Sequence, residues 1–479
     1  MTFTDQEKVT LPNAAGKGGM SEPHLNKFQG AALIVGAMIG SGIFTNPGKV
    51  FGLIGSTLPS LLLWIFGALV ASVASLNYAE LGSRITQSGG DAPFLDAAFT
   101  KPHRFMAIMY SWTRVVLINP GYCSSLGYLV GQYLTDAFPD ALGSAESTKR
   151  WIGTIVLLVQ TLACVPSNKT AGKFLTYVAA MSVLMLALFS GTGMAVLVGA
   201  APKVRNLENF SADHLFAGTV TNPGTWASAL FKVLWAYDGF ANLASSLSEL
   251  RNPEKNIKKA TVMGISTVAV LYLFANLSYL VVLSYTDLST LAEGVAAQWA
   301  SNLFGKTGTT IVTAAIALVV FACSYVSLFS ASRVAQAQGE SGLMFPSSVF
   351  SAVHSRTGTP LNALVFNLVL SLALVWGPPD GDVFWTIITL VSYPLWVWYG
   401  MTALALFVLK RRGPAPEGAV VVPMIAPLFV MAVSLFLSIF PYFDPDQVLP
   451  SALSWAFVAA GVVPYYLLQR GSRVSGTTA

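Results

Sequence analysis

A membrane-length helix that breaks in its middle is the feature that most constrains this chain. Residues 28–51 read FQGAALIVGAMIGSGIFTNPGKVF, an apolar run interrupted by Gly40-Ser41-Gly42. Glycine inside a helix costs about 1 kcal/mol relative to alanine, so two glycines around a serine favour local unwinding. The N–H and C=O groups that unwinding frees cannot stay unsatisfied in hydrocarbon. The break therefore predicts a site that is buried in protein or faces a water-filled cavity.

Composition places this break in a membrane. The chain has 479 residues, of which 54% are hydrophobic and 10% charged, whereas soluble domains carry roughly 25% charged residues. Apolar runs of about 18 residues or more are long enough to cross a bilayer, and the sequence holds twelve. They lie near 28–54, 57–82, 103–135, 150–167, 174–198, 225–246, 260–285, 308–333, 361–378, 383–409, 424–441 and 450–469. The sequence predicts an all-α polytopic membrane protein with 12 transmembrane helices.

Lysine and arginine are unequally divided between the two sides of such a protein. With the amino terminus in the cytoplasm, nineteen of the 27 fall on the cytoplasmic side and six outside, while Arg114 and Lys232 lie within apolar runs. Cytoplasmic loops of membrane proteins carry this excess, so both termini are predicted to be cytoplasmic. The net charge of +5 then requires no nucleic acid as partner.

A second break is predicted in the sixth run. Leu234-Trp235-Ala236-Tyr237-Asp238-Gly239-Phe240 is apolar except for Asp238-Gly239, a pair that favours a turn. A carboxylate at this depth indicates function, either as a contact to substrate or proton or as an acceptor for loose backbone donors. Five spans, an odd number, separate the two breaks, so equivalent halves would cross the membrane in opposite directions. Paired interrupted helices are typical of the substrate site of secondary transporters with inverted repeats.

The predicted organisation follows from this 5+5 inverted repeat with discontinuous helices 1 and 6. Residues 1–26 form a disordered cytoplasmic tail, because they are polar and of mixed charge, and 471–479 form a second tail. The transporter domain spans 27–470. It contains repeat one at 28–198, repeat two at 225–409 and two appended helices at 424–469.

Three charged residues near or inside the runs each leave two interpretations open. Glu80, at the end of helix 2, is either a solvated or salt-bridged end charge or part of an intracellular gate. Arg114 either forms a structural pair or lines the pathway. Lys232 either extends outward to the membrane surface or has a role within the bundle. Glu249, in the polar segment after helix 6, is a candidate latch for the inner gate.

Before helix 3, the segment 83–94, SRITQSGGDAPF, is expected to be a re-entrant element.

Several motifs together resemble the amino-acid transporters of the APC superfamily, in particular the L-type (light-subunit) family. They are GSGIF at 40–44, YAELG at 78–82, SGGD at 88–91, WAYDG at 235–239, ELRNPEKN at 249–256 and SASR at 330–333, and the resemblance covers about 28–469. It implies a secondary transporter that moves neutral or cationic amino acids by alternating access, as an exchanger or a proton-coupled symporter.

The resemblance also implies roles for residues at the two breaks. The amides of Ser41, Gly42 and Ile43 would bind the substrate carboxylate, which agrees with the positive dipole end of the outer half-helix. Carbonyls near Met38, Ile39 and Trp235 would bind the ammonium, and Trp235 would close over the substrate as a gate. The predicted substrate contacts are Met38, Ile39, Gly40, Ser41, Gly42, Ile43, Trp235, Ala236, Tyr237, Asp238 and Gly239. The gate or coupling candidates are Glu80, Arg114, Ser182, Trp235, Asp238 and Glu249.

Departures from the family pattern modify these expectations. Light subunits bind a heavy chain through a cysteine in the loop after helix 3, but 136–149 contains none, so no disulfide-linked heavy subunit is expected. Ser182 stands where many relatives carry a lysine in place of a sodium ion, which leaves ion coupling open.

Other function classes have less support from the residues. No nucleophile with a base, paired acids or metal-ligand spacing appears in the runs, so neither an enzyme nor a cofactor nor a metal is predicted. A transporter of another small amine or amino-acid derivative, and a channel or receptor, remain alternatives. The plasma membrane is expected in preference to an internal membrane.

Overall fold

The computed structural model describes residues 26–474, except 88, 166–167, 242, 244–249, 292–293, 382 and 444. The described residues form helices and connections, with no strand among them. Seven helices, together with one bent pair, are long and apolar enough to cross a membrane. The chain is therefore an all-helical, multi-pass membrane protein, as predicted.

Each of the twelve predicted runs coincides with one helix or with consecutive helices. In chain order these are α1 (Lys27–Met38) with α2 (Gly42–Ile54); α3 (Thr57–Arg84); α5 (Phe105–Thr113) with η1 (Arg114–Ile118) and α6 (Asn119–Ala137); α8 (Glu146–Ala163); α9 (Asn168–Leu197); α11 (Pro223–Ala236); α13 (Pro253–Val282); α15 (Val295–Glu340); α17 (Leu361–Trp376); α18 (Val383–Arg412); α19 (Ile425–Ile439); and α20 (Pro445–Ala460) with α21 (Val462–Val474).

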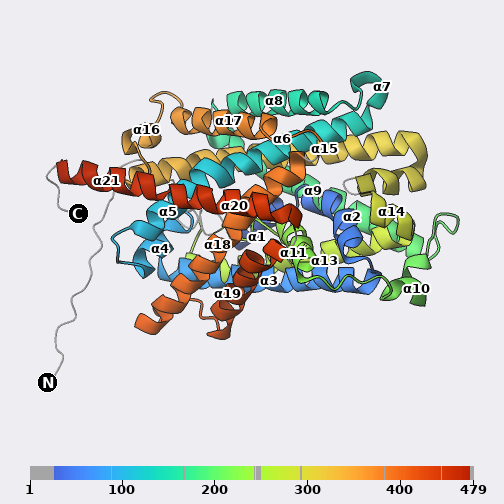
Figure 1. Ribbon diagram of the computed structural model, residues 1–479, viewed down its shortest axis with the longest axis horizontal. Coiled ribbons are helices and arrows are strands. Elements are labelled where there is room, and N and C mark those ends of the chain that lie inside the picture. Colours follow the sequence, from blue (N-terminus) through green and yellow to red (C-terminus); the bar gives the residue numbers. More distant parts are fainter. Residues whose placement is uncertain are drawn as a thin grey trace.

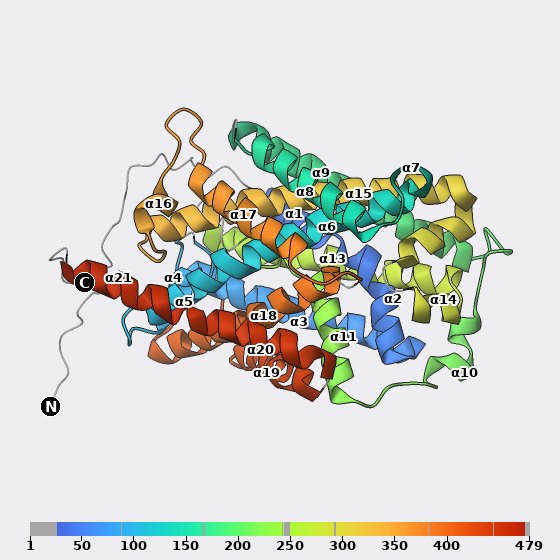
Figure 2. The ribbon, with the colours of Figure 1, turned by 45° about the horizontal axis from the view of Figure 1, so that its top comes forward.

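Short helices fill the connections between the long ones. They are α4 (Ala92–Ala98), α7 (Pro139–Leu142), η2 (Glu208–Phe210), α10 (Ala212–Leu215), α14 (Tyr285–Thr290), α16 (Ser347–Ser351) and η5 (Phe440–Phe443). Figures 1 and 2 both show α4, α16 and the end of α21 at one end of the long axis, and α7, α10 and α14 at the other. These two groups are the connections that the charge pattern assigns to opposite sides of the membrane.

Two helices differ from the predicted runs. The run 308–333 is the middle of α15, which extends over Val295–Glu340 and leaves helical geometry at Gly305, with φ of 67°. Residues 295–304 are therefore separated from the run by an irregular residue and are too few to form a span by themselves. The end beyond the run carries Gln336, Gln338 and Glu340, which lower its hydropathy. The run 225–246 corresponds to α11, which already ends at Ala236.

The predicted tails are described only in part. α21 continues to Val474, four residues into the segment expected as the second tail. Residues 1–25 of the first tail lie outside the described part.

The interrupted helices pack against each other at the centre of the bundle. α1 and α2 are bent by 48° at their break. α2 packs against α11, while α1 packs against α13 and α9, and α13 in turn packs against α3. The two breaks therefore lie side by side inside the protein, where other helices can satisfy their backbone groups.

Candidate functional site

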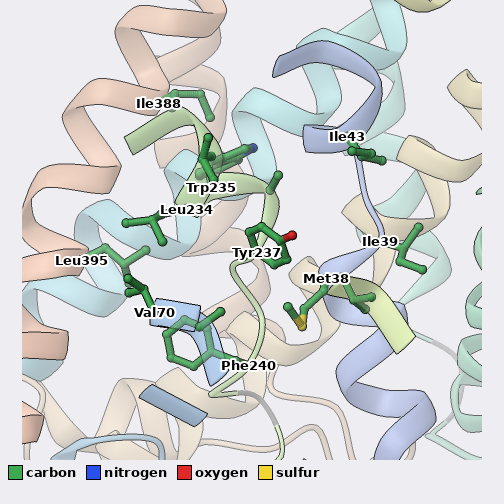
Figure 3. Close-up of a cluster of buried hydrophobic side chains, with 14 of the residues drawn as sticks. Met38, Ile39, Ile43, Val70, Leu234, Trp235, Tyr237, Phe240, Ile388 and Leu395 are labelled. Atoms are coloured by element: carbon green, nitrogen blue, oxygen red, sulfur yellow. The ribbon is translucent and has the colours of Figure 1, made fainter. Parts of the chain in front are cut away.

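A cavity of about 70 Å³ lies between the two breaks. Its lining combines the break of helix 1, the break that follows α11, one face of α6 with η1, and one face of α15. The lining residues are Ala37, Met38, Gly40, Ser41, Gly42, Arg114, Asn119, Tyr122, Leu126, Trp235, Asp238, Gly239, Cys323, Ser327, Ser330 and Ala331. Figure 3 shows the stretch that carries Met38, Ile39 and Ile43 beside the stretch that carries Trp235, Tyr237 and Phe240.

The break of helix 1 provides backbone donors at this cavity. α1 ends at Met38, and α2 begins at Gly42 after Ser41 as N-cap. The first amides of a helix have no partner within that helix, and they carry its positive dipole end. The Ser41 carbonyl, by contrast, already accepts from the Phe44 and Thr45 amides and from Thr45 Oγ1. The groups of this break that remain free to bind a ligand are therefore N–H donors, which suit an anionic group such as a carboxylate.

The second break places a carboxylate in the cavity wall. α11 ends at Ala236, and the chain then turns through Gly239, whose φ is 112°. The predicted end of the helix within 236–239 is thus confirmed. The Asp238 carboxylate accepts a hydrogen bond from Tyr122 Oη, and its Oδ1 accepts one from Tyr399 Oη at 2.5 Å. Both carboxylate oxygens are therefore engaged by phenol groups from α6 and α18.

Arg114 faces the same cavity and belongs to a short π-helix, η1. The amide of Asn119 donates to the Arg114 carbonyl, five residues earlier. Pro120 has no N–H to donate, and a wider turn just before it accommodates that loss. Such π-turns are frequent at functional sites, and this one directs Arg114 to the cavity.

Trp235 and Tyr122 form a stacked pair in the cavity wall. Their ring centroids are 4.5 Å apart, with planes inclined by 16°. Tyr122 also donates to Asp238, so one tyrosine links the aromatic pair to the carboxylate. The sequence identified Trp235 but missed Tyr122. Asn119, Tyr122 and Leu126 are spaced three and four residues apart on α6, and this helical spacing next to the π-turn was the available signal.

Of the predicted substrate contacts, seven line the cavity: Met38, Gly40, Ser41, Gly42, Trp235, Asp238 and Gly239. Ile39, Ile43, Ala236 and Tyr237 are buried next to them but do not line it. Tyr237 packs its ring against Trp64 and Tyr272. The breaks were thus located correctly, but only some of the residues at each break line the space between the helices.

Tyr272 of α13 joins the two breaks directly. Its hydroxyl lies 2.6 Å from the Met38 carbonyl and 2.9 Å from the Ala236 carbonyl, and it can donate to either. Met38 O also accepts from the Gly40 amide at 2.9 Å. One carbonyl predicted to bind the ammonium therefore already has protein donors. The role of Tyr272 was not predicted, because nothing in its local sequence indicates a contact 234 residues away.

Glu80 lies outside the cavity, in a buried ion-pair cluster. Its carboxylate accepts from Lys410 Nζ at 2.8 Å, from Arg84 at 2.7 Å and from the Val422 amide at 2.7 Å. Glu80 is fully buried, so the salt-bridged interpretation agrees with the structure, whereas a solvated end charge does not. The cluster joins the ends of α3 and α18 to the connection after α18.

The remaining candidates lie elsewhere. Ser182 is buried on α9, and Glu249 lies outside the described residues. Lys232 does not extend outward, because its side chain is buried with Nζ 4.3 Å from the centroid of the Trp385 ring. Within the described part of the chain, no group of three or more His, Cys, Asp and Glu side chains has the geometry of a metal site.

Comparison with known proteins gives the family. The model of the amino acid permease family matches residues 25–464. The b(0,+)-type amino acid transporter 1 of Mus musculus is 29% identical over 438 residues, which cover 91% of this chain and 86% of the relative. The serine/threonine exchanger SteT of Bacillus subtilis is 26% identical over 412 residues, 84% of this chain and 87% of the relative.

Two further relatives are also named as amino-acid transporters. The high-affinity methionine permease of Saccharomyces cerevisiae is 26% identical over 432 residues, and the chain covers 72% of its length. The large neutral amino acids transporter small subunit 2 of Rattus norvegicus is 28% identical over 472 residues, which are 97% of this chain. With its cavity between two broken helices and a family match over nearly its whole length, the chain belongs to the amino acid permease family and is a multi-pass membrane transporter of amino acids.

Proposed function

We propose that this protein carries small neutral amino acids across its membrane by alternating access, as a secondary active transporter. The cavity lined by both breaks is the observation that carries this proposal. The first amides of α2 bind the substrate carboxylate, and carbonyls of the second break, with Asp238 nearby, receive the ammonium. The aromatic pair of Trp235 and Tyr122 covers the occupied site. The 5+5 inverted repeat supplies the two halves that move against each other.

The size of the cavity supports a small substrate. About 70 Å³ is roughly five to seven times the volume of about 10–15 Å³ that a single water requires by the same kind of measure. Alanine and serine have six and seven non-hydrogen atoms, which is close to the number of waters that the cavity could hold. Ser327, Ser330 and Asn119 in the wall provide hydrogen-bonding groups for a hydroxyl on the side chain.

The charged residues around the cavity favour a substrate whose side chain is neutral. Asp238 would attract a cationic side chain, but both its oxygens already accept from tyrosine hydroxyls. Arg114 places a guanidinium in the same wall, and like charges repel strongly where water is scarce. Transport of cationic amino acids is the second candidate function, because Asp238 faces the cavity.

Partners and location are part of the same proposal. All three cysteines are buried, so no thiol is placed to form a bond with another subunit, and we propose that the carrier functions without a disulfide-linked partner. The lysine and arginine pattern supports cytoplasmic termini, and the plasma membrane is the proposed location.

Reconstitution into liposomes tests the function. Liposomes that contain the purified protein are loaded with each unlabelled amino acid in turn. Uptake of labelled serine, alanine, leucine and arginine into them is then measured. We expect saturable uptake that is fastest for serine and alanine and is stimulated by internal substrate. Uptake that does not saturate with substrate concentration would favour a channel. Preference for an amine without a carboxylate would contradict the proposed role of the α2 amides.

Asp238→Asn separates the two substrate classes. If the substrate is neutral, we expect transport of all amino acids to fall together, by at least about tenfold, because the side-chain amide carries no charge and only its oxygen can still accept from a tyrosine hydroxyl. A loss confined to arginine and lysine would instead establish the cationic function. Uptake competition in the same liposomes measures both.

Cys323 provides a readout of occupancy, since it is the cysteine that lines the cavity. A small thiol reagent should inhibit uptake, and excess substrate should protect against it. Cys323→Ala is the matched control and should resist the reagent. Inhibition of Cys323→Ala to the same extent would place the reactive thiol at Cys123 or Cys164, away from the proposed site.

A further inference from the structure

A second buried carboxylate lies beside the site, in the segment that precedes α4. Asp91 is the N-cap residue of α4, and only 4% of it is exposed. Its Oδ2 accepts from Tyr78 Oη at 2.6 Å and from Thr402 Oγ1 at 3.0 Å. Asp91 therefore lies where α4 meets α3 and α18. The mechanism proposed above gives it no part.

Asp91 belongs to the same charge cluster as Asp238. Tyr399, which donates to Asp238, packs its ring against that of Tyr78, with centroids 6.1 Å apart. Arg114 acts electrostatically on both carboxylates, and the carboxylates act on each other. Other ionisable groups that face Asp91 are the phenols of Tyr78 and Tyr110. Glu80 has its own cations in Arg84 and Lys410.

Two carboxylates and one guanidinium leave this cluster one negative charge in excess. In the described part of the chain, neither Asp91 nor Asp238 has a cationic side chain within 4.0 Å. An uncompensated charge away from water is expensive, so such a group tends to become neutral. One bound proton would make the cluster electrically neutral.

We propose that Asp91 is a proton-binding site of the transport cycle, so that an amino acid and a proton cross the membrane together. The proton adds to Oδ1, because Oδ2 keeps its two hydrogen bonds, and the carboxylate becomes a carboxylic acid. This inference rests on the proposed function as a carrier, and it names the coupling ion. It makes a symporter of a chain whose relatives include a named exchanger.

The pKa of Asp91 lies in the pH range in which a proton can bind and leave during transport. Burial raises the pKa of Asp91 from 3.8 to about 6, although the hydrogen bonds from Tyr78 and Thr402 and the charge of Arg114 act in the opposite direction. Since the acid form is the neutral one, protonation increases as pH falls through this value. The protonated fraction is about 0.9 at pH 5 and about 0.1 at pH 7 for a group with this pKa.

The location of Asp91 explains how proton release is linked to movement. α4 is held to α18 at its other end, where Arg412 donates to the carbonyls of Ala97 and Ala98. Separation of α4 from α3 and α18 would bring water to Asp91 and favour its ionised form. A proton taken up while this contact is closed would then be released when it opens.

The test is uptake by liposomes at external pH values from 5 to 8, with internal pH held at 7.5. We expect uptake to fall about tenfold between pH 5 and pH 7, in proportion to the protonated fraction. Asp91→Asn should remove this pH dependence. Asp96→Asn is the matched control, because Asp96 lies on the same helix but is half-exposed and paired with Arg104 at 3.5 Å; its pH profile should match the parent.

Two further variants keep the test decisive if Asp91→Asn does not fold. Tyr78→Phe and Thr402→Val each remove a hydrogen bond that lowers the pKa of Asp91. Both should therefore move the midpoint of the pH profile upward. A purely structural role would change the rate without moving the midpoint, and an unmoved midpoint in both variants would overturn the proposal.

Infrared difference spectroscopy on the purified protein is independent of transport. A carboxylic-acid band that titrates near pH 6 in the parent and is absent in Asp91→Asn is the expected result. Amino-acid uptake without pH dependence, together with an Asp91 ionised throughout, would reject proton coupling and leave the carrier function intact. The titrating band without any amino-acid uptake would reject the carrier function instead.

Discussion

At the scale of single residues, two glycines allow the breaks to touch. A Cβ added to Gly42 would lie 2.5 Å from Ala236 Cα, and one added to Gly239 would lie 2.9 Å from the Ala37 carbonyl carbon. Each glycine thus faces the backbone of the other broken helix. Because backbone cannot move aside as a flexible side chain can, any larger residue must separate the two segments that line the cavity.

Gly42→Ala should therefore weaken binding of every substrate at least about tenfold, since the displaced α2 amides serve all carboxylates. The measurement is equilibrium binding of labelled amino acids to purified protein. Gly191→Ala is the control, because a Cβ at Gly191 meets nothing within 4 Å, and it should bind as the parent does. A loss restricted to some substrates would contradict a shared carboxylate site.

At the scale of elements, the broken helices depend on side chains from intact ones. α13 contributes Tyr272 to the carbonyls of Met38 and Ala236, and Tyr279 to the Ile43 carbonyl at 3.3 Å. Without such donors, carbonyls freed by unwinding would be left unpaired inside the protein. α13 is thus the element that makes both interruptions tolerable.

Tyr272→Phe should lower the free energy of unfolding by about 1–3 kcal/mol, the cost of leaving a buried acceptor unsatisfied. Thermal unfolding of the purified protein in detergent measures the effect as a lower midpoint. Tyr466→Phe removes an exposed hydroxyl and should leave the midpoint unchanged. Equal midpoints for Tyr272→Phe and the parent would mean that water can replace the phenol at the breaks.

At the scale of the whole molecule, one ion-pair cluster connects the two predicted repeats. Glu80 and Arg84 lie on α3, in repeat one, and Lys410 lies on α18, at the end of repeat two. All three side chains are at most 10% exposed. Any relative movement of the repeats that opens this end must separate these charges.

Glu80→Gln should reduce stability by about 3–5 kcal/mol, because removal of one partner leaves buried cations uncompensated. A double-mutant cycle with Lys410→Met measures the coupling. The double variant should be less destabilised than the sum of the single variants. Strict additivity would show that Glu80 and Lys410 act independently.

The sequence predicted the apolar helices and both breaks, because these depend on local composition. Gly40-Ser41-Gly42 and Asp238-Gly239 are contiguous signals, and the apolar runs are properties of neighbouring residues. The partners of the site could not be predicted in this way. Tyr122 and Tyr399 reach Asp238 across 116 and 161 residues of chain, and their own neighbours in sequence resemble those of any packed tyrosine.

Arg114 illustrates the intermediate case. Its depth in helix 3 marked it as unusual, but a regular helix would have given no reason to prefer the cavity over a structural pair. The π-turn at 114–118, just before Pro120, directs its side chain to the cavity. The proline can be read from the sequence, but the change in direction that the wider turn gives to Arg114 cannot.

Two clusters of different chemistry, the ion pairs at Glu80 and the aromatic pairs near the breaks, have a consequence for heat capacity. Glu80 is held by Arg84 and Lys410, whereas Trp235 stacks on Tyr122, and Phe44 packs edge-on against Phe189. Exposure of polar surface lowers the heat capacity by about 0.26 cal/K/mol per Å², and apolar exposure raises it by about 0.45. If the transport cycle opens the charged cluster in one state and the aromatic contacts in the other, exchange between these states carries a net heat-capacity change, and substrate affinity should follow a curved van't Hoff plot.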